Sequence, residues 1–241
     1  MNFIKKNNAH WKLSRRNATP PKCSKTAANA WGKFRGDGRN KTMEYCFQEQ
    51  KGLCGYSEVQ LEYLTPILTA NLATEIGFCL GNHLEHIIPK SFKPEKTFDH
   101  FNLILSSISS DSLKTMDKAD VFGGHARQDW YSADGFIHPL LEDCSGYFHY
   151  EISGKVVPKL SLKRREKAKA RLTIYKLNLN ASILVTWRRN WLEQLITIVD
   201  SLLDDEDSLK NFAELELSCI NGVLRPFYSA QKQVFGELVV K

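Results

Sequence analysis

One short stretch, HLEHIIPKS at residues 83–91, places the tightest local constraint on how this chain can fold. Its β-branched residues favour a strand, and Pro89 ends any regular strand or helix because proline lacks an amide hydrogen. Asn102 follows His86 by sixteen residues and opens NLILSS, which favours a second short strand. A helix is expected over 110–120, with Ser110 or Asp111 as its N-cap. These signals predict a strand pair followed by a helix.

The remaining sequence predicts an α+β chain in three parts. Residues 1–41 are polar, basic and interrupted by proline, glycine and asparagine, which predicts an extended basic arm docked on the protein or on a ligand. Residues 42–160 combine a helix over 42–52 with turns and short strands, including a hairpin at ISGKVV. Residues 161–241 have mainly helical periodicity.

The helical part contains one strongly amphipathic segment. Apolar residues recur there at three- and four-residue steps, which predicts a helix packed on the core: Ile183, Leu184, Trp187, Trp191, Leu195, Ile198 and Leu202. This helical region, 161–241, is also the expected docking surface for a partner protein.

The positive charge of the chain is unevenly distributed. Residues 1–41 hold eleven Lys or Arg and one Asp, a net charge of +10, whereas the remaining 22 basic and 26 acidic residues leave −4. A second basic run, KLSLKRREKAKAR, spans 159–171. Two basic patches suit a polyanion such as nucleic acid, since phosphate neutralisation releases counterions. A solvated helix face is the alternative for either patch taken alone.

No apolar run approaches the length of a membrane span, and the first residues lack the apolar core of a signal peptide. We therefore expect a cytoplasmic protein with no membrane partner. The six cysteines have no paired spacing typical of a disulfide scaffold, so idle or buried thiols are expected.

Around the predicted strand pair lie the residues suited to phosphodiester hydrolysis. His86 is the candidate general base, because imidazole accepts a proton near neutral pH. Glu85 and Asp111 are candidate oxygen ligands of a hard cation such as Mg²⁺ or Mn²⁺. Asn102 can fix the active loop or the His86 ring through its amide. Two lysines, Lys90 and Lys114, are candidate phosphate contacts.

The run EHIIPKS…FDHFNLILSSISSDSLK resembles the core of an HNH (ββα-metal) endonuclease. That family has an acid–His pair, then Asn-Leu, then Cys-x-x-Cys followed by Asn or His and a Lys. In this register Asp111 takes the metal-binding position and Lys114 the lysine position. Flanking segments resemble the PtuB-like nucleases of Septu-type and retron-linked antiphage systems, so the resemblance covers most of residues 40–200.

The resemblance also identifies the positions of a zinc knuckle, at which most of the cysteine ligands are replaced. Of four cysteine positions only Cys54 keeps a thiol, while serine stands at Ser57, Ser107 and Ser110. A serine hydroxyl is a poor zinc ligand beside a thiolate, so we predict no structural zinc there. Packing and hydrogen bonds are expected to hold the knuckle instead.

The resemblance implies a metal-dependent HNH endonuclease acting in antiphage defence with an SMC/ABC-like ATPase. In retron versions it also implies a reverse transcriptase with its RNA–DNA hybrid. The alternative is a catalytically degenerate nucleic-acid-binding subunit of such a complex. Two histidines keep open roles: His83 is structural or a substrate contact, and His125 is an ordinary turn residue or approaches a phosphate.

Overall fold

The computed structural model describes residues 1–61 and 80–239, which form an α+β fold. The helices are α1 (Trp11–Asn17), α2 (Ser24–Gly32), α3 (Asp37–Glu49), α5 (Ser110–Thr115), α6 (Gly124–Arg127), α7 (Arg164–Lys176), α8 (Ser182–Ser201), α9 (Glu206–Leu217) and α10 (Tyr228–Val239). The strands are β1 (Asn82–His86), β2 (Leu103–Ser107), β3 (Phe148–Tyr150) and β4 (Val156–Pro158), and short 3₁₀ helices are η1 (Pro94–Lys96), η2 (His100–Asn102), η3 (Lys118–Asp120) and η4 (Cys144–Tyr147). Within these residues no helix is both long and apolar enough to cross a bilayer.

The predicted strand pair is confirmed as the antiparallel hairpin β1–β2. Glu85 lies opposite Ile104 and His86 opposite Leu103, and all five residues of β2 are buried. The following helix α5 is also present, but it ends at Thr115 and does not continue to 120, and neither predicted N-cap is right. Ser109 caps it, because its backbone is extended and its hydroxyl accepts a hydrogen bond from the Ser112 amide.

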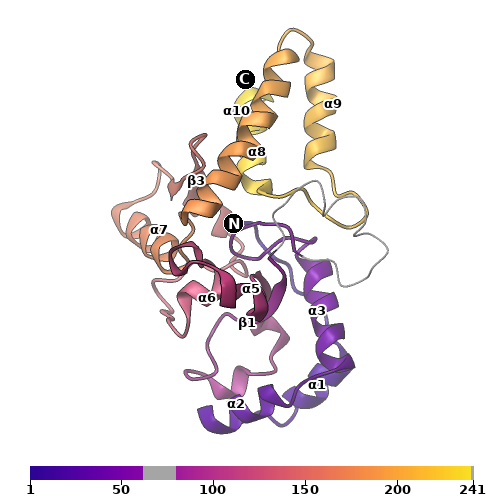
Figure 1. The fold of residues 1–241 in the computed structure, drawn as a ribbon, viewed down its shortest axis with the longest axis vertical. Coiled ribbons are helices and arrows are strands. Elements are labelled where there is room, and N and C mark those ends of the chain that lie inside the picture. The colour runs from indigo at the N-terminus through magenta and orange to yellow at the C-terminus, as the bar shows by residue number, and fades with distance from the viewer. Residues whose placement is uncertain (62–79, 240–241) are drawn as a thin grey trace.

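Two apolar clusters hold the fold together. One surrounds the β1–β2 hairpin and is built from residues of both strands, the N-terminal helices, the segment around Phe136 and α7. The other joins α8, α9 and α10 to Val59, Ile108 and Phe122. Figure 1 shows the consequence: α8 and α9 project at one end, α1 and α2 lie at the other, and β1 lies between them.

The expectation that residues 1–41 are extended is wrong. They contain α1, α2 and the start of α3, and they dock on the hairpin cluster through the buried side chains of Leu13 and Phe34. The Phe34 ring meets Phe98 edge to face at 5.5 Å. A few well-placed apolar residues therefore outweigh the polar composition. The helix predicted over 42–52 begins earlier, at Asp37.

The predicted ISGKVV hairpin and the helical region after 161 are both confirmed. The apolar stripe of α8 differs in detail, since its buried face includes the fully buried Arg188 and leaves Ile198 44% exposed. Arg188 donates to the Gly154 carbonyl and lies over the rings of Tyr150 and Phe227. A buried arginine of this kind gives no periodic signal in a sequence.

Gly154 allows the close approach of the β3–β4 turn to α8, and we predict that Gly154→Ala is destabilising. Its φ angle is +84°, and an added Cβ would lie 2.1 Å from the Val185 carbonyl oxygen. The expected loss is roughly 2–4 kcal/mol of unfolding free energy, measured by urea denaturation. Gly146→Ala is the matched control, since nothing lies within 4 Å of its added Cβ. Equal loss in both variants would contradict this.

Candidate functional site

Glu85 lies on the face of β1 that α6 covers. Gly124 approaches it so closely that an added Cβ would lie 2.6 Å from the Glu85 carboxyl carbon. Arg127 Nη2 donates to Glu85 Oε1, and the other oxygen, Oε2, lies 3.6 Å from His83 Nε2. Burial acts to raise the pKa of Glu85, but the His83 ring and the Arg127 charge lower it to about 2. Glu85 is therefore an anion with one oxygen left for a further cation.

Arg127 is the residue that fixes this face of the hairpin. It is 3% exposed, and besides Glu85 it donates to the carbonyl oxygens of His86 at 2.6 Å, Ile87 at 3.2 Å and Trp130 at 2.7 Å. Nothing in the sequence around it, GGHARQDW, distinguishes Arg127 from a surface arginine. Sequence reasoning missed it for that reason.

His86 lies on the opposite face of β1. Its Nε2 is 3.0 Å from the Thr97 carbonyl oxygen, which can only accept, so this nitrogen carries the proton and Nδ1 has the lone pair. The ring meets Trp31 of α2 edge to face at 4.4 Å, and the residue is 5% exposed. Burial, with help from the Lys90 charge, lowers the pKa of His86 to about 3. The ring is therefore neutral at physiological pH, and it is a much weaker base than the near-neutral imidazole on which the prediction of a general base rested.

Asn102 holds the loop that follows His86. Its Oδ1 accepts from the Ile88 amide at 2.7 Å, and its Nδ2 donates to the carbonyl oxygens of Ile88 at 3.0 Å and Lys96 at 3.1 Å. The side chain thus ties both ends of the loop to the start of β2. This is the loop-fixing geometry expected of Asn102, although the chemistry it would serve stays a prediction.

A cationic cluster surrounds Trp31 beside His86. Lys90 Nζ lies 5.9 Å from the Trp31 ring centre, and the Arg39 guanidinium lies 5.2 Å from it. Burial lowers the pKa of both side chains, and neither makes an ion pair with a described residue. Half-buried cations without a carboxylate partner favour an anion. Lys90 was a predicted phosphate contact, whereas Arg39 and Trp31 were missed because they lie in the segment expected to be extended.

Asp111 and Lys114 lie apart from these contacts. Both are exposed residues of α5, and Lys114 Nζ donates to Asp111 Oδ1 at 2.7 Å. That hydrogen bond lowers the pKa of Asp111 and raises the pKa of Lys114. Within residues 1–61 and 80–239, no hydrogen bond or ion pair joins Asp111 to Glu85 or His86. Its role as a metal ligand stays a prediction from the resemblance.

Three of the four knuckle positions come together. The Ser107 amide donates to Cys54 Sγ at 3.3 Å, and the hydroxyls of Ser57 and Ser107 lie 3.5 Å apart. These three residues are buried, whereas Ser110 is exposed at the start of α5. Hydrogen bonds thus join the three buried positions, as expected; that no zinc binds there stays a prediction. Among the other cysteines, Cys79 lies outside the described residues.

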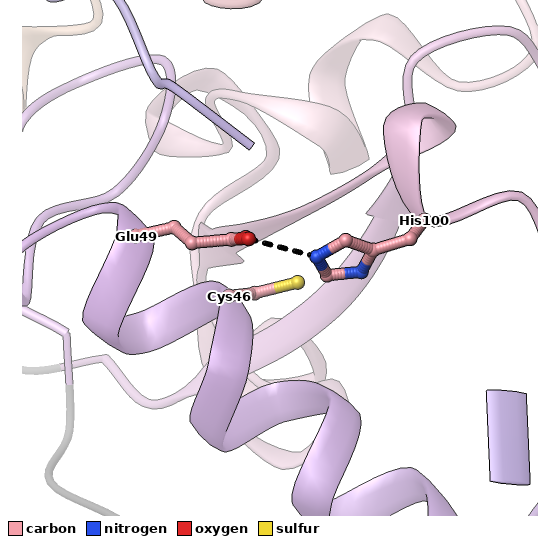
Figure 2. Close-up of side chains that lie close together, drawn as sticks. All are labelled: Cys46, Glu49 and His100. Carbon is pink, nitrogen blue, oxygen red and sulfur yellow. Dashed lines mark hydrogen bonds and ion pairs between the residues drawn. The ribbon is translucent and has the colours of Figure 1, made fainter. Parts of the chain in front are cut away.

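A second group of metal-ligating residue types lies between α3 and η2. Figure 2 shows that Cys46, Glu49 and His100 point toward one another, with His100 Nε2 2.8 Å from Glu49 Oε1. Lys6 already places a cation there, since its ammonium lies 2.5 Å from Glu49 Oε2 and 2.9 Å from the Leu103 carbonyl oxygen. Burial raises the pKa of the Cys46 thiol to about 11. A metal ion would have to displace Lys6, so the group serves as a buried ion-pair cluster.

An open groove of about 1020 Å³ runs between α5, α6 and α7 and reaches the Glu85 side of the hairpin through His125. Its lining includes Lys118, Arg171 and Lys176, and no Asp or Glu is among the described residues that line it. None of the three cations makes an ion pair within the described chain. The groove therefore presents uncompensated positive charge beside the candidate site.

Comparison with known proteins finds no protein-family model and no curated protein that matches the chain.

Because burial keeps His86 neutral, we predict that this residue makes stability fall as pH falls. The unfolded ring has a pKa near 6.5 and the folded ring about 3, so below pH 6.5 protons bind the unfolded chain preferentially. Between pH 6.5 and 5 this costs roughly 1.5 kcal/mol. Urea denaturation at the two pH values should show a smaller loss in His86→Leu than in wild type.

His149→Leu provides the control for general histidine effects. His149 belongs to β3, away from the hairpin β1–β2. It should keep the wild-type pH dependence. If His86→Leu and wild type lose the same free energy over this range, His86 is not a buried neutral ring.

Proposed function

We propose that this protein is a metal-dependent endonuclease of the HNH type that hydrolyses phosphodiester bonds in nucleic acid. The observation that carries the proposal is the hairpin with its clamped loop. Asn102 fixes the backbone at Ile88 and Lys96, while Thr97, the next residue, holds the His86 ring through Nε2. A general base needs such a fixed tautomer with one free lone pair.

The chain's own groups suit the parts of such a hydrolysis. His86 Nδ1 is the lone pair that would accept a proton from the attacking water. Lys90 and Arg39, half-buried beside Trp31, would neutralise phosphate oxygens next to His86. Desolvated cations of this kind stabilise charge that develops in the transition state.

The residues at Glu85 fit a divalent cation. One carboxylate oxygen is held by Arg127 and the other faces an imidazole nitrogen, so a hard oxygen and a nitrogen donor are side by side. Mg²⁺ or Mn²⁺ bound there would supply charge stabilisation for the phosphoryl oxygens and the departing oxygen. Asp111, the second acidic residue of the motif, would bind the cation only after its ion pair with Lys114 is broken.

Activity is expected to depend on both faces of β1. We predict that His86→Ala and Glu85→Gln each lower the rate of DNA or RNA cleavage by about 100-fold or more, and that EDTA abolishes it. Cleavage of labelled single- and double-stranded DNA and RNA measures this directly. His149→Ala, in β3, should cleave like wild type. Wild-type cleavage by His86→Ala would remove this ring from the reaction.

The basic groove supports nucleic acid as the substrate, and we predict that it contributes to binding. Arg171→Ala combined with Lys176→Ala should weaken oligonucleotide binding and make the slope of log affinity against log salt shallower by about 1.4–1.8. Fluorescence anisotropy over a salt series measures both. Lys210→Ala is the matched control, since Lys210 lies on α9 and pairs with Glu206. An unchanged slope in the double variant would exclude phosphate contacts in the groove.

A catalytically degenerate nucleic-acid-binding subunit is the second candidate. Three observations favour it: Trp31 covers His86, burial lowers the pKa of that ring to about 3, and Arg127 already occupies one oxygen of Glu85. It would bind oligonucleotides with a steep salt dependence. The cleavage assay separates the two candidates, since metal-dependent turnover belongs to the endonuclease alone.

A role in antiphage defence beside an SMC/ABC-like ATPase, and in a retron setting beside a reverse transcriptase with its RNA–DNA hybrid, is part of the same proposal. It rests on the resemblance of the sequence. The helical end of the fold offers exposed apolar side chains suited to a protein partner: Ile198, Leu203, Leu215 and Ile220.

A further inference from the structure

His83 and Glu85 face each other across a gap that no hydrogen bond spans. They lie two residues apart on β1, so both side chains project from the same face of the strand. His83 Nε2 and Glu85 Oε2 are 3.6 Å apart, and both side chains are about 15% exposed, at 14% and 15%. The two side chains are within ion-pair distance of each other when the ring is protonated, and solvent reaches them.

The His83 ring has one nitrogen already committed. Nδ1 lies 2.8 Å from the Ile108 carbonyl oxygen, which can only accept, so Nδ1 carries the proton. In the neutral ring the lone pair of Nε2 then points toward a carboxylate oxygen. Two electron-rich atoms facing each other need a proton or a cation between them. Metal-binding histidines characteristically donate their other nitrogen to a backbone carbonyl in this way.

The neighbouring His125 reinforces the orientation. Its Nε2 lies 3.1 Å from the same Ile108 oxygen, and its ring packs against His83 with centres 4.0 Å apart and the two planes tilted by 35°. Two imidazoles thus share one carbonyl acceptor at the edge of the basic groove that His125 lines. His125 is a positioning residue here, since it holds the His83 ring rather than facing Glu85.

We infer that His83 is a nitrogen ligand, together with Glu85 Oε2, of the divalent cation, and that this ligand pair favours Mn²⁺ over Mg²⁺. At metal–ligand distances of about 2.1 Å, the two donors of an octahedral ion lie about 3.0 Å apart, so this pair, at 3.6 Å, would close by roughly 0.6 Å on binding. Mg²⁺ prefers oxygen and keeps its water, whereas transition metals accept imidazole. Only two protein ligands leave positions open for water and a phosphate oxygen.

This inference deepens the proposed function and rests on it for the cation's role, but its test measures binding. Metal-stripped full-length protein is titrated at neutral pH with Mn²⁺, followed by the electron paramagnetic resonance signal of free Mn²⁺, and with Mg²⁺ by calorimetry. His83→Gln should weaken Mn²⁺ binding by about tenfold or more and Mg²⁺ binding far less. Glu85→Gln should lose both ions.

His149→Gln is the matched control and should bind both ions like wild type; circular dichroism confirms that every variant is folded. Equal Mn²⁺ affinity in wild type and His83→Gln, or no Mn²⁺ binding by wild type, would overturn the inference. If Mn²⁺ binds through His83 but no nucleic acid is cleaved, the metal site stands and the nuclease proposal falls. If wild type cleaves and His83→Gln keeps its Mn²⁺ affinity, the His83 assignment alone falls.

Discussion

The buried ion pair between Arg127 and Glu85 fixes the end of β1 and the orientation of the Glu85 carboxylate. Arg127 holds the Glu85 carboxylate while donating to the carbonyl oxygens of His86 and Ile87, so one side chain sets the end of β1 and the direction of its only acid. Removing one partner of such a buried pair typically costs about 3–5 kcal/mol. Gly124 makes the approach of α6 possible. The Glu85 oxygen that Arg127 does not bind, Oε2, therefore faces His83.

Alternate side chains of β1 point to opposite faces of the strand, so the candidate metal ligands and the candidate base lie on different sides of it. Glu85 and His83 lie on the side that α6 covers, where His125 lines the basic groove, while His86 faces α2. On the His86 side, Lys90 and Arg39 lie over the ring of Trp31. For the proposed hydrolysis, a cation held by Glu85 and the lone pair of His86 would both have to reach one phosphodiester group at the end of this strand. The clamp made by Asn102 keeps the connecting loop in register with both.

Local sequence signals identified the hairpin and most of the later helices, but they did not identify the contacts between segments far apart in the sequence. The β-branched run before Pro89 and the strand after Asn102 identified the hairpin, and helical periodicity identified α7 to α9, because each signal is contained in a few neighbouring residues. The contacts of Arg127, Trp31 and Arg39 join segments far apart in sequence, so no local pattern announces them. Polar composition misled in residues 1–41, where sparse apolar residues decide the fold.

Three places compete to be the metal site: Glu85 with His83, Asp111 on α5, and the Cys46–Glu49–His100 group filled by Lys6. The most direct test is an anomalous difference map, recorded at the manganese absorption edge from crystals grown with Mn²⁺. A peak between Glu85 Oε2 and His83 Nε2 is expected. A peak only at Asp111 or at the Lys6 cluster, or no peak in a well-ordered hairpin, would contradict the cation site on which the proposed chemistry depends.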